Sequence, residues 1–181
     1  QPQKALNCAQ KAVRIKPDEK TLRAHISQAN LMLGNWKEAW EDYDSNLGVV
    51  NGRRERTYGP IPRWSGVEGL NLIVHGEQGL GDEISFASCI PDVMKENKIV
   101  IECDARLQKL FQRSFGVPVY GTLYFKGGLE WPLEHSIDAK VAMGSLPGFY
   151  RNSEESFPGT PYLIADPERR VQWRALLHCL G

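Results

Sequence analysis

Glycines and carboxylic acids are concentrated in the segment GEQGLGDE, residues 76–83, the part of this sequence best suited to chemistry. Its glycine spacing, G-x-x-G-x-G followed by Asp82, is neither the dinucleotide fingerprint G-x-G-x-x-G nor a Walker loop, which needs Gly-Lys-Ser/Thr. Glu77, Asp82 and Glu83 are expected to crowd the start of the following helix, where a phosphate would otherwise bind. Their negative charges would repel a phosphate, so the segment is not predicted to hold a nucleotide.

Asp82 has two interpretations, which are compatible with each other. Aspartate is among the best N-caps of a helix, and acids suit the first helical turn. An ionised carboxylate where a strand gives way to a helix could also act as a general base toward a hydroxyl group. Residue type and position alone favour the cap.

The elements on either side place this segment at the edge of a sheet. Residues 70–75 are apolar and predict a strand. Residues 82–97 predict one helix, with Ile84, Ala87, Pro91 and Met94 facing inward and a kink at Pro91. Ligands of open α/β sheets bind where strands end and helices begin, so the glycine segment lies where a site is expected.

The rest of the C-terminal part continues this alternation. Further strands are predicted at residues 98–103, 117–120 and 137–143, and further helices at 105–115 and from Pro167 through Leu180. Strands alternating with helices predict a parallel, right-handed, Rossmann-like sheet. A long irregular stretch at 121–136, which carries Tyr124, Phe125, Trp131 and His135, is expected to be functional or badly ordered.

Residues 3–47 predict helices only. Their apolar stripes are Ala5, Ala9 and Ala12, then Leu22, Ile26, Ala29 and Leu33, then Trp36, Ala39, Trp40, Tyr43 and Leu47. Ala5 and Ala39 are 34 residues apart, which is the tetratricopeptide period, although an ordinary helical hairpin would show similar stripes. Since about three repeats are needed to bury a continuous core, these helices are expected to lean on the following domain or on upstream repeats.

A Gly-, Pro- and Arg-rich joint, residues 48–69, separates the two parts, with the boundary expected near Asn51. The domains are therefore a helical stub at 1–51 and a Rossmann-like domain at 52–181. Tyr58 and Trp64 in the joint are expected to dock it on the core rather than to bind a ligand.

Composition excludes several classes of protein. The net charge is zero, with 41% hydrophobic and 24% charged residues, which is ordinary for a globular domain and unlike a nucleic-acid-binding surface. No apolar stretch is long enough for a membrane span, and no signal peptide is recognisable. The four cysteines have no metal-ligand spacing, and three lie in apolar or helical surroundings, which predicts reduced, buried thiols and a cytoplasmic protein. No metal or cofactor is expected.

The motifs GEQGLGDEISFASCIPD, IVIECDARLQKLF, SLPGFY and PYLIADPERRVQW resemble bacterial proteins in which tetratricopeptide repeats run into a GT-B glycosyltransferase similar to the lipopolysaccharide heptosyltransferases. The resemblance spans residues 5–173, and Gly-Leu-Gly-Asp is its most specific part. It implies that Asp82 acts as general base toward an acceptor hydroxyl, with Glu77, Gln78, Gly79 and Gly81 forming an acceptor-binding loop.

The resemblance further implies a sugar or peptide acceptor and a nucleotide-sugar donor. The donor would bind mainly a C-terminal Rossmann domain, expected to begin where this chain stops, so the chain would be an acceptor half that is inactive alone. Glu83 and Ser88 stand where Thr and Arg are expected, and Pro91 lies farther from Asp82 than is typical. Acceptor identity therefore does not transfer.

Two other readings remain open. The chain could be a non-catalytic interaction module, in which repeats and a degenerate Rossmann domain hold a protein partner. A nucleotide-binding Rossmann protein is the weaker reading, because the acids of the glycine segment disfavour it. The sequence that follows residue 181 would discriminate between an enzyme and an interaction module.

Overall fold

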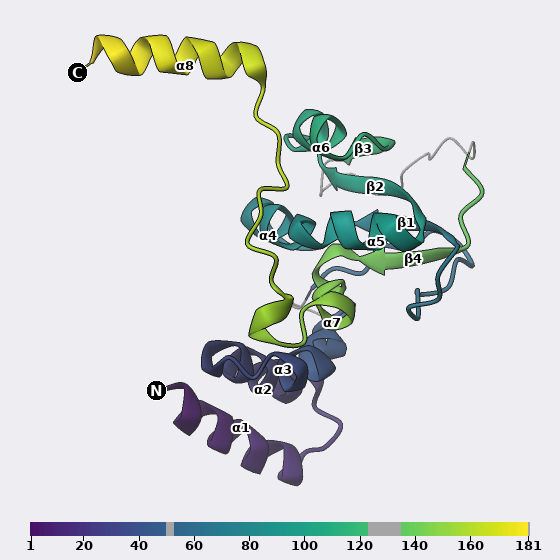
Figure 1. The fold of residues 1–181 in the computed structure, drawn as a ribbon. Coiled ribbons are helices and arrows are strands. Elements are labelled where there is room, and N and C mark those ends of the chain that lie inside the picture. The colour runs from purple at the N-terminus through teal and green to yellow at the C-terminus, as the bar shows by residue number, and fades with distance from the viewer. Residues whose placement is uncertain (50–52, 123–134, 181) are drawn as a thin grey trace.

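The structure is a computed structural model that describes residues 1–49, 53–122 and 135–180. It is an α/β protein in which a helical region precedes a four-stranded parallel sheet, as the sequence predicts (Figure 1). The expected domain boundary near Asn51 and the aromatic residues Tyr124, Phe125 and Trp131 lie outside the described residues.

The helical region comprises α1 (Pro2–Ile15), α2 (Lys20–Leu33) and α3 (Trp36–Tyr43), followed by the short 3₁₀ turn η1 (Asp44–Asn46). Leu6, Ile26 and Ala29 form its small core, and α2 ends at Gly34 in the left-handed conformation, where glycine is favoured. Ala5 was expected on the apolar stripe of α1 but is exposed. The face of α1 that packs on α2 is instead the one centred on Leu6.

All strands of the sheet are parallel. They are β1 (Asn71–His75), β2 (Lys98–Asp104), β3 (Val119–Thr122) and β4 (Ala139–Ala142), in the order β3-β2-β1-β4. The first two match the predicted strands closely, whereas β3 begins and ends two residues later than predicted and β4 is shorter. The chain thus builds outward from β1 to β3 and then returns to the other side of β1.

The predicted helix at 82–97 is wrong as a single element. The segment forms α4 (Leu80–Phe86), the 3₁₀ turn η2 (Ala87–Cys89) and α5 (Ile90–Glu96). Pro91 does not kink a helix interior. It lies exposed in the first turn of α5, where proline is tolerated because its missing N–H would have no helical partner.

The main core lies between one face of the sheet and the helices. Leu72, Val74 and Ile101 from the strands meet Ile90 of α5 and Phe111 of α6 (Gln108–Phe115), and all five are fully buried. Of the residues expected to face inward from 82–97, only Ala87 is fully buried, and Ile84 and Met94 are half-buried. The break at η2 turns Cys89, Ile90 and Val93 toward the sheet instead.

The joint packs on the α/β part, as predicted. Trp64 is 6% exposed within the main core, and its backbone N–H donates to the Lys140 carbonyl of β4. Tyr58 donates its hydroxyl proton to the buried Glu102 carboxylate of β2 and lies beside the ring of His75. The joint therefore runs along β4 and over the carboxyl ends of β1 and β2.

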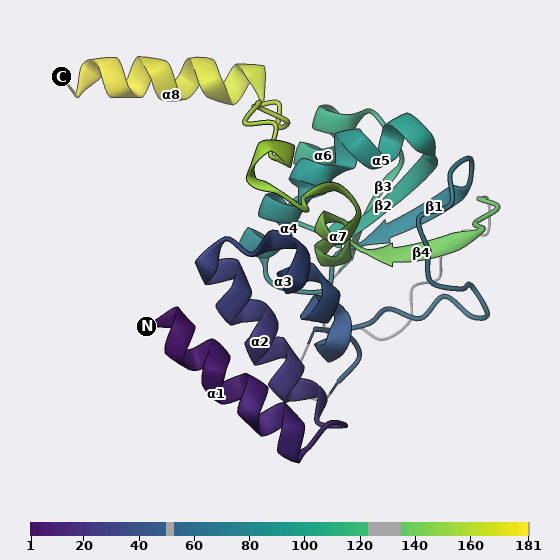
Figure 2. The ribbon, with the colours of Figure 1, turned by 60° about the horizontal axis from the view of Figure 1, so that its bottom comes forward.

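The helical region also packs on the α/β part (Figure 2). Trp36 contacts Phe157, Tyr43 contacts Phe86, and the Trp40 indole N–H donates to the Arg151 carbonyl over 2.7 Å. These three aromatic residues of α3 are half-buried at this interface. This confirms that the stub leans on the following domain.

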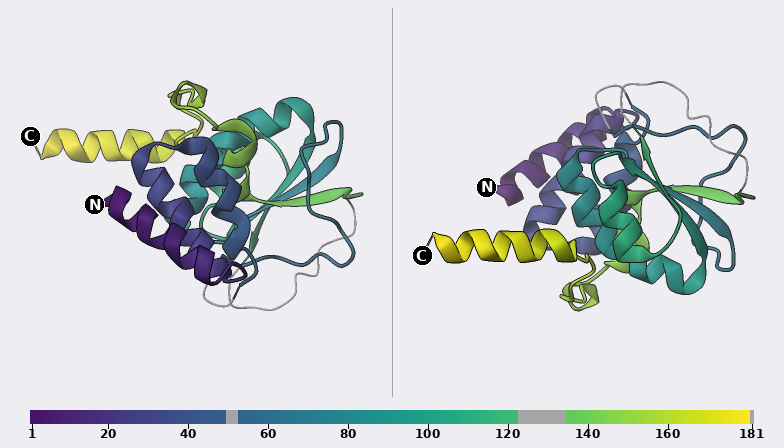
Figure 3. Two further views of the ribbon diagram at one scale, coloured as in Figure 1. Left: turned by 90° about the horizontal axis from the view of Figure 1, so that it is seen from below. Right: turned by 90° about the horizontal axis from the view of Figure 1, so that it is seen from above.

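The remaining elements follow β4. They are the 3₁₀ turn η3 (Met143–Ser145), α7 (Pro147–Tyr150), the 3₁₀ turn η4 (Glu154–Ser156) and α8 (Pro167–Cys179). Asp166 caps α8, which begins at Pro167 as predicted and extends away from the body of the molecule (Figures 1 and 3). Its Val171, Trp173 and Leu177 are exposed. No helix within the described residues is long and apolar enough to cross a membrane.

Candidate functional site

The candidate site is the point where the direction of strand addition reverses. β1 is flanked by β2 on one side and β4 on the other, so the loops that follow β1 and β4 diverge at this point. Crevices of this kind, at the carboxyl ends of parallel strands, are where ligands of doubly wound sheets bind. The glycine segment follows β1, and η3 follows β4.

Asp82 occupies the first turn of α4 and is exposed. It is not the N-cap. Gly79 is, and the Asp82 carboxylate reaches back so that its Oδ2 accepts the Gly79 N–H over 3.0 Å. Within the described parts of the chain, the other carboxylate oxygen accepts no hydrogen bond. Asp82 thus closes the turn with one oxygen and presents the second to solvent.

Glu77 does not crowd the helix start as the sequence suggested. It turns inward, is 3% exposed, and its Oε1 accepts from Arg53 Nη2 over 2.9 Å and from the Gly144 N–H over 3.2 Å. Burial raises the pKa of Glu77 above its ordinary value, and the neighbouring Arg53 guanidinium opposes that rise. Glu77 turns inward because it pairs with the buried Arg53 guanidinium. The sequence of the glycine segment alone could not predict this contact.

The other residues expected to bind an acceptor divide between the interior and the surface. Gln78 is half-buried, and its side-chain amide donates to the Tyr43 hydroxyl over 2.9 Å. Gly79 and Gly81 are exposed, and the space beside Gly81 is open. The exposed part of the segment is therefore formed by Gly79, Gly81 and Asp82, whereas Glu77 and Gln78 are buried and half-buried.

Glu83, which was also expected to crowd the helix start, is instead buried. It is 1% exposed, its Oε2 accepts the Asp104 N–H over 2.8 Å, and no partner within the described residues reaches its Oε1. A Cβ at Gly76 would lie 2.3 Å from that oxygen, so residue 76 must be glycine for the carboxyl group to fit. Glu83 thus joins α4 to the end of β2.

Burial raises the pKa of Glu83 to about 7, with the nearby Asp104 and Glu77 carboxylates adding to the rise. The ordinary value is 4.5, so between these values the folded protein holds a proton that the unfolded chain releases. Stability should therefore fall as the pH rises through this window. Glu83→Gln should remove that part of the decline and raise the melting temperature above pH 7.

Thermal melts of both proteins from pH 4.5 to pH 8 test this expectation. A difference of ~1 kcal/mol in unfolding free energy corresponds to roughly 2–4 °C for a chain of this size. The difference between variant and parent should grow with pH and level off above pH 7. Parallel curves would show that Glu83 does not titrate in this window.

A second polar group lies beside the site, at the ends of β1, β2 and β3. The buried Glu102 carboxylate accepts from Tyr58, from Thr122 Oγ1 over 2.9 Å, and is paired with Arg56. Burial lowers the pKa of the neighbouring His75 to about 3, so this imidazole is neutral at physiological pH. Each polar group has a structural partner, and the cluster anchors the joint to the sheet.

Within the described residues, no group of three or more histidines, cysteines and acids is placed to hold a metal ion. The cysteines are free thiols. Cys89 and Cys103 are buried, whereas Cys8 and Cys179 are exposed. Three buried thiols were expected, and the structure buries two.

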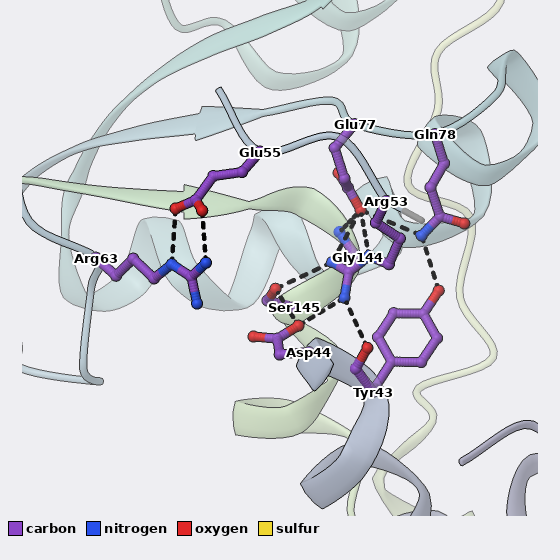
Figure 4. A network of polar contacts seen from close by, with 9 residues as sticks. All are labelled: Tyr43, Asp44, Arg53, Glu55, Arg63, Glu77, Gln78, Gly144 and Ser145. Atoms are coloured by element: carbon purple, nitrogen blue, oxygen red, sulfur yellow. Dashed lines mark hydrogen bonds and ion pairs between the residues drawn. The ribbon is translucent and has the colours of Figure 1, made fainter. Parts of the chain in front are cut away.

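Arg53 is the residue that sequence reasoning missed. It is 5% exposed and contacts Tyr43, Asp44, Glu77 and Ser145, which come from three separate parts of the chain (Figure 4). In the sequence it was one member of the run Arg53-Arg54-Glu55-Arg56. The only local signal was a cluster of arginines in a joint that otherwise has the composition of a turn.

Comparison with curated proteins finds a relative in Caulobacter vibrioides, protein FlbA, which is 31% identical over 169 residues. The match covers 83% of this chain and 28% of FlbA, so the chain spans little more than a quarter of the relative's length. No family model matches the sequence, and no solved structure matches it.

Proposed function

We propose that this chain is the acceptor-side half of a glycosyltransferase of the GT-B type, preceded by tetratricopeptide-like helices. Asp82 would serve as the general base that takes the proton from the acceptor hydroxyl as the sugar leaves its nucleotide. The observation that carries this proposal is the exposed Asp82 carboxylate, held at the carboxyl edge of a parallel sheet with one oxygen open to solvent.

The contents of the switch-point crevice support an acceptor role over a donor role. A nucleotide bound there would need free backbone N–H groups and space for its phosphates. The Gly79 N–H is instead taken by Asp82, and the Gly144 N–H by Glu77. The Arg53 side chain lies between the two loops and donates to Glu77 in one and to Ser145 in the other. The donor would therefore bind a separate domain.

The exposed face of α8 and the length of FlbA agree with a further domain. Apolar side chains such as Trp173 and Leu177 are exposed on a helix that extends from the body, and such residues are normally covered. FlbA is more than three times as long as the segment that matches here. In this proposal α8 is the bridge to the donor-binding domain, and the protein acts in the cytoplasm.

A non-catalytic interaction module is the second candidate, and one observation favours it. The same Arg53 network that excludes a nucleotide also holds Glu77 and Gln78, two of the residues expected to meet an acceptor. If Asp82 serves only to close the turn of α4, the helices would be the functional surface and would hold a protein partner.

Calorimetric titration of nucleotide sugars separates these possibilities. UDP-glucose, GDP-mannose and ADP-glucose should give no measurable binding to residues 1–181. One of them should bind the full-length protein with a micromolar dissociation constant. Micromolar binding to residues 1–181 would contradict the acceptor assignment, and no binding to the full-length protein by any nucleotide sugar would favour the interaction module.

A further inference from the structure

The switch-point crevice is filled by side chains that come from the helical region and the joint. Tyr43 and Asp44 lie at the end of α3 and in η1, and Arg53 lies in the joint. Arg53 contacts Glu77 of the glycine segment, Tyr43 contacts Gln78, and Asp44 binds Arg53 (Figure 4). The shape of a loop at the edge of the sheet is thus connected to helices that precede the sheet in the chain.

The Arg53 guanidinium is held from three directions. Its Nη1 donates to Asp44 Oδ1 over 2.6 Å and to the Tyr43 carbonyl over 3.2 Å, and its Nε and Nη2 both donate to Glu77 Oε1. Nη2 also donates to Ser145 Oγ over 3.1 Å. The ring of Tyr43 lies 4.3 Å from the guanidinium carbon, in the geometry of a cation–π contact. A lysine could supply the charge but not this planar fork.

The glycine segment receives further contacts from the same source. The Gln78 amide donates to the Tyr43 hydroxyl, and the Arg54 N–H donates to the Glu77 carbonyl over 3.2 Å. The closeness of the packing requires glycine at position 144, where a Cβ would lie 2.5 Å from Glu77 Oε1. The backbone of Glu77 and both side chains of the pair Glu77–Gln78 are therefore set by the helical region and the joint.

We propose that Tyr43 and Arg53 are positioning residues that set the conformation of residues 76–82 and thereby the direction of the Asp82 carboxylate. The helical region then contributes to the site, and a partner that moves α3 would alter the conformation of residues 76–82. The functional meaning rests on the acceptor role proposed above. The positioning itself can be measured without any transfer reaction.

Hydrogen–deuterium exchange of the protein tests the proposal with three variants. Tyr43→Phe removes one hydroxyl and keeps the ring, Arg53→Lys keeps the charge and removes the fork, and Arg23→Gln breaks a pair with Asp42 that lies within the helical region. We expect exchange in residues 76–83 to rise roughly threefold to tenfold in the first two variants and to stay unchanged in the control.

Strand β2 provides the internal reference. Its exchange should stay at the parent rate in Tyr43→Phe and in Arg53→Lys, because none of the hydrogen bonds that these variants lose ends on β2. Unchanged exchange in residues 76–83, or an equal rise in β2 and the loop, would overturn the positioning role. In the full-length protein, Tyr43→Phe should then lower kcat and leave the donor KM unchanged. A loop that responds in a protein that transfers no sugar would contradict the proposed function and leave the positioning role standing.

Discussion

Arg53→Ala should lower the unfolding free energy by about 3–5 kcal/mol, the range for removing one partner of a buried ion pair. The physical reason is the carboxylate that remains. Glu77 is 3% exposed, and without Arg53 its charge would stay buried beside Gly144 with only neutral hydrogen-bond donors. Asp44 and Ser145 would lose a shared donor as well. Denaturant unfolding measures the change.

Arg63→Ala is the matched control for this experiment. Arg63 forms a two-point pair with Glu55, at 2.6 and 2.7 Å, that is as short as any contact of Arg53 (Figure 4). Its side chain is 52% exposed, and exposed pairs contribute only about 0–1 kcal/mol. Equal losses in the two variants would mean that burial of Arg53 and Glu77 does not determine the effect.

A second control removes both charges. Arg53→Ala combined with Glu77→Ala should cost less than the sum of the two single changes, because the double variant leaves no buried charge without its partner. Strict additivity would show that the two side chains stabilise the fold independently, and the network would then not act as a unit.

The sheet could be predicted from sequence because its signal is local. The runs at 70–75 and 98–103 are short and apolar, are flanked by breaking residues, and alternate with helical patterns, which is enough to predict parallel strands. The packing of α3 on the α/β part was also predictable. Trp36, Trp40 and Tyr43 share one face of this helix, and the helical stub has too few helices to bury them by itself.

The break after Phe86 was not predictable from periodicity. A helical pattern at 82–97 fits one helix and fits equally two helices joined by a 3₁₀ turn, and Pro91 alone does not decide between a kink and a new first turn. The difference matters for the site. It separates the short α4, which carries Asp82, from α5, which packs on the sheet.

The arrangement of the acids depended on contacts far apart in the chain. Glu77, Asp82 and Glu83 look equivalent in sequence, but Arg53 draws Glu77 inward and the Asp104 N–H receives Glu83. Only Asp82 remains at the surface. The sequence reflects this arrangement only in Gly76 and Gly144, where a Cβ would collide with the carboxyl groups of Glu83 and Glu77. A glycine in a loop is equally typical of an ordinary turn.

Asp82→Asn should lower the rate of sugar transfer by the full-length protein by a factor on the order of 10²–10⁴, the usual effect of removing a general base. An amide cannot accept the proton of the acceptor hydroxyl. The fold should change little, because the Asn side-chain oxygen can still accept the Gly79 N–H that Asp82 Oδ2 accepts now.

Asp18→Asn is the control for the loss of one negative charge. Asp18 is also exposed, but it lies in the turn between α1 and α2, and within the described residues it forms no hydrogen bond or ion pair with the glycine segment. This variant should transfer sugar at the parent rate. Melting temperatures of both variants should lie close to that of the parent, so that a lost rate cannot be attributed to unfolding.

The proposal that Asp82 acts as a base is tested most directly by the transfer rate of Asp82→Asn at saturating donor and acceptor. Under these conditions weaker binding of either substrate does not affect the rate. We expect a loss of at least about a hundredfold with an unchanged melting temperature. A variant that transfers sugar at the parent rate would contradict it, and Asp82 would then serve only to close the first turn of α4.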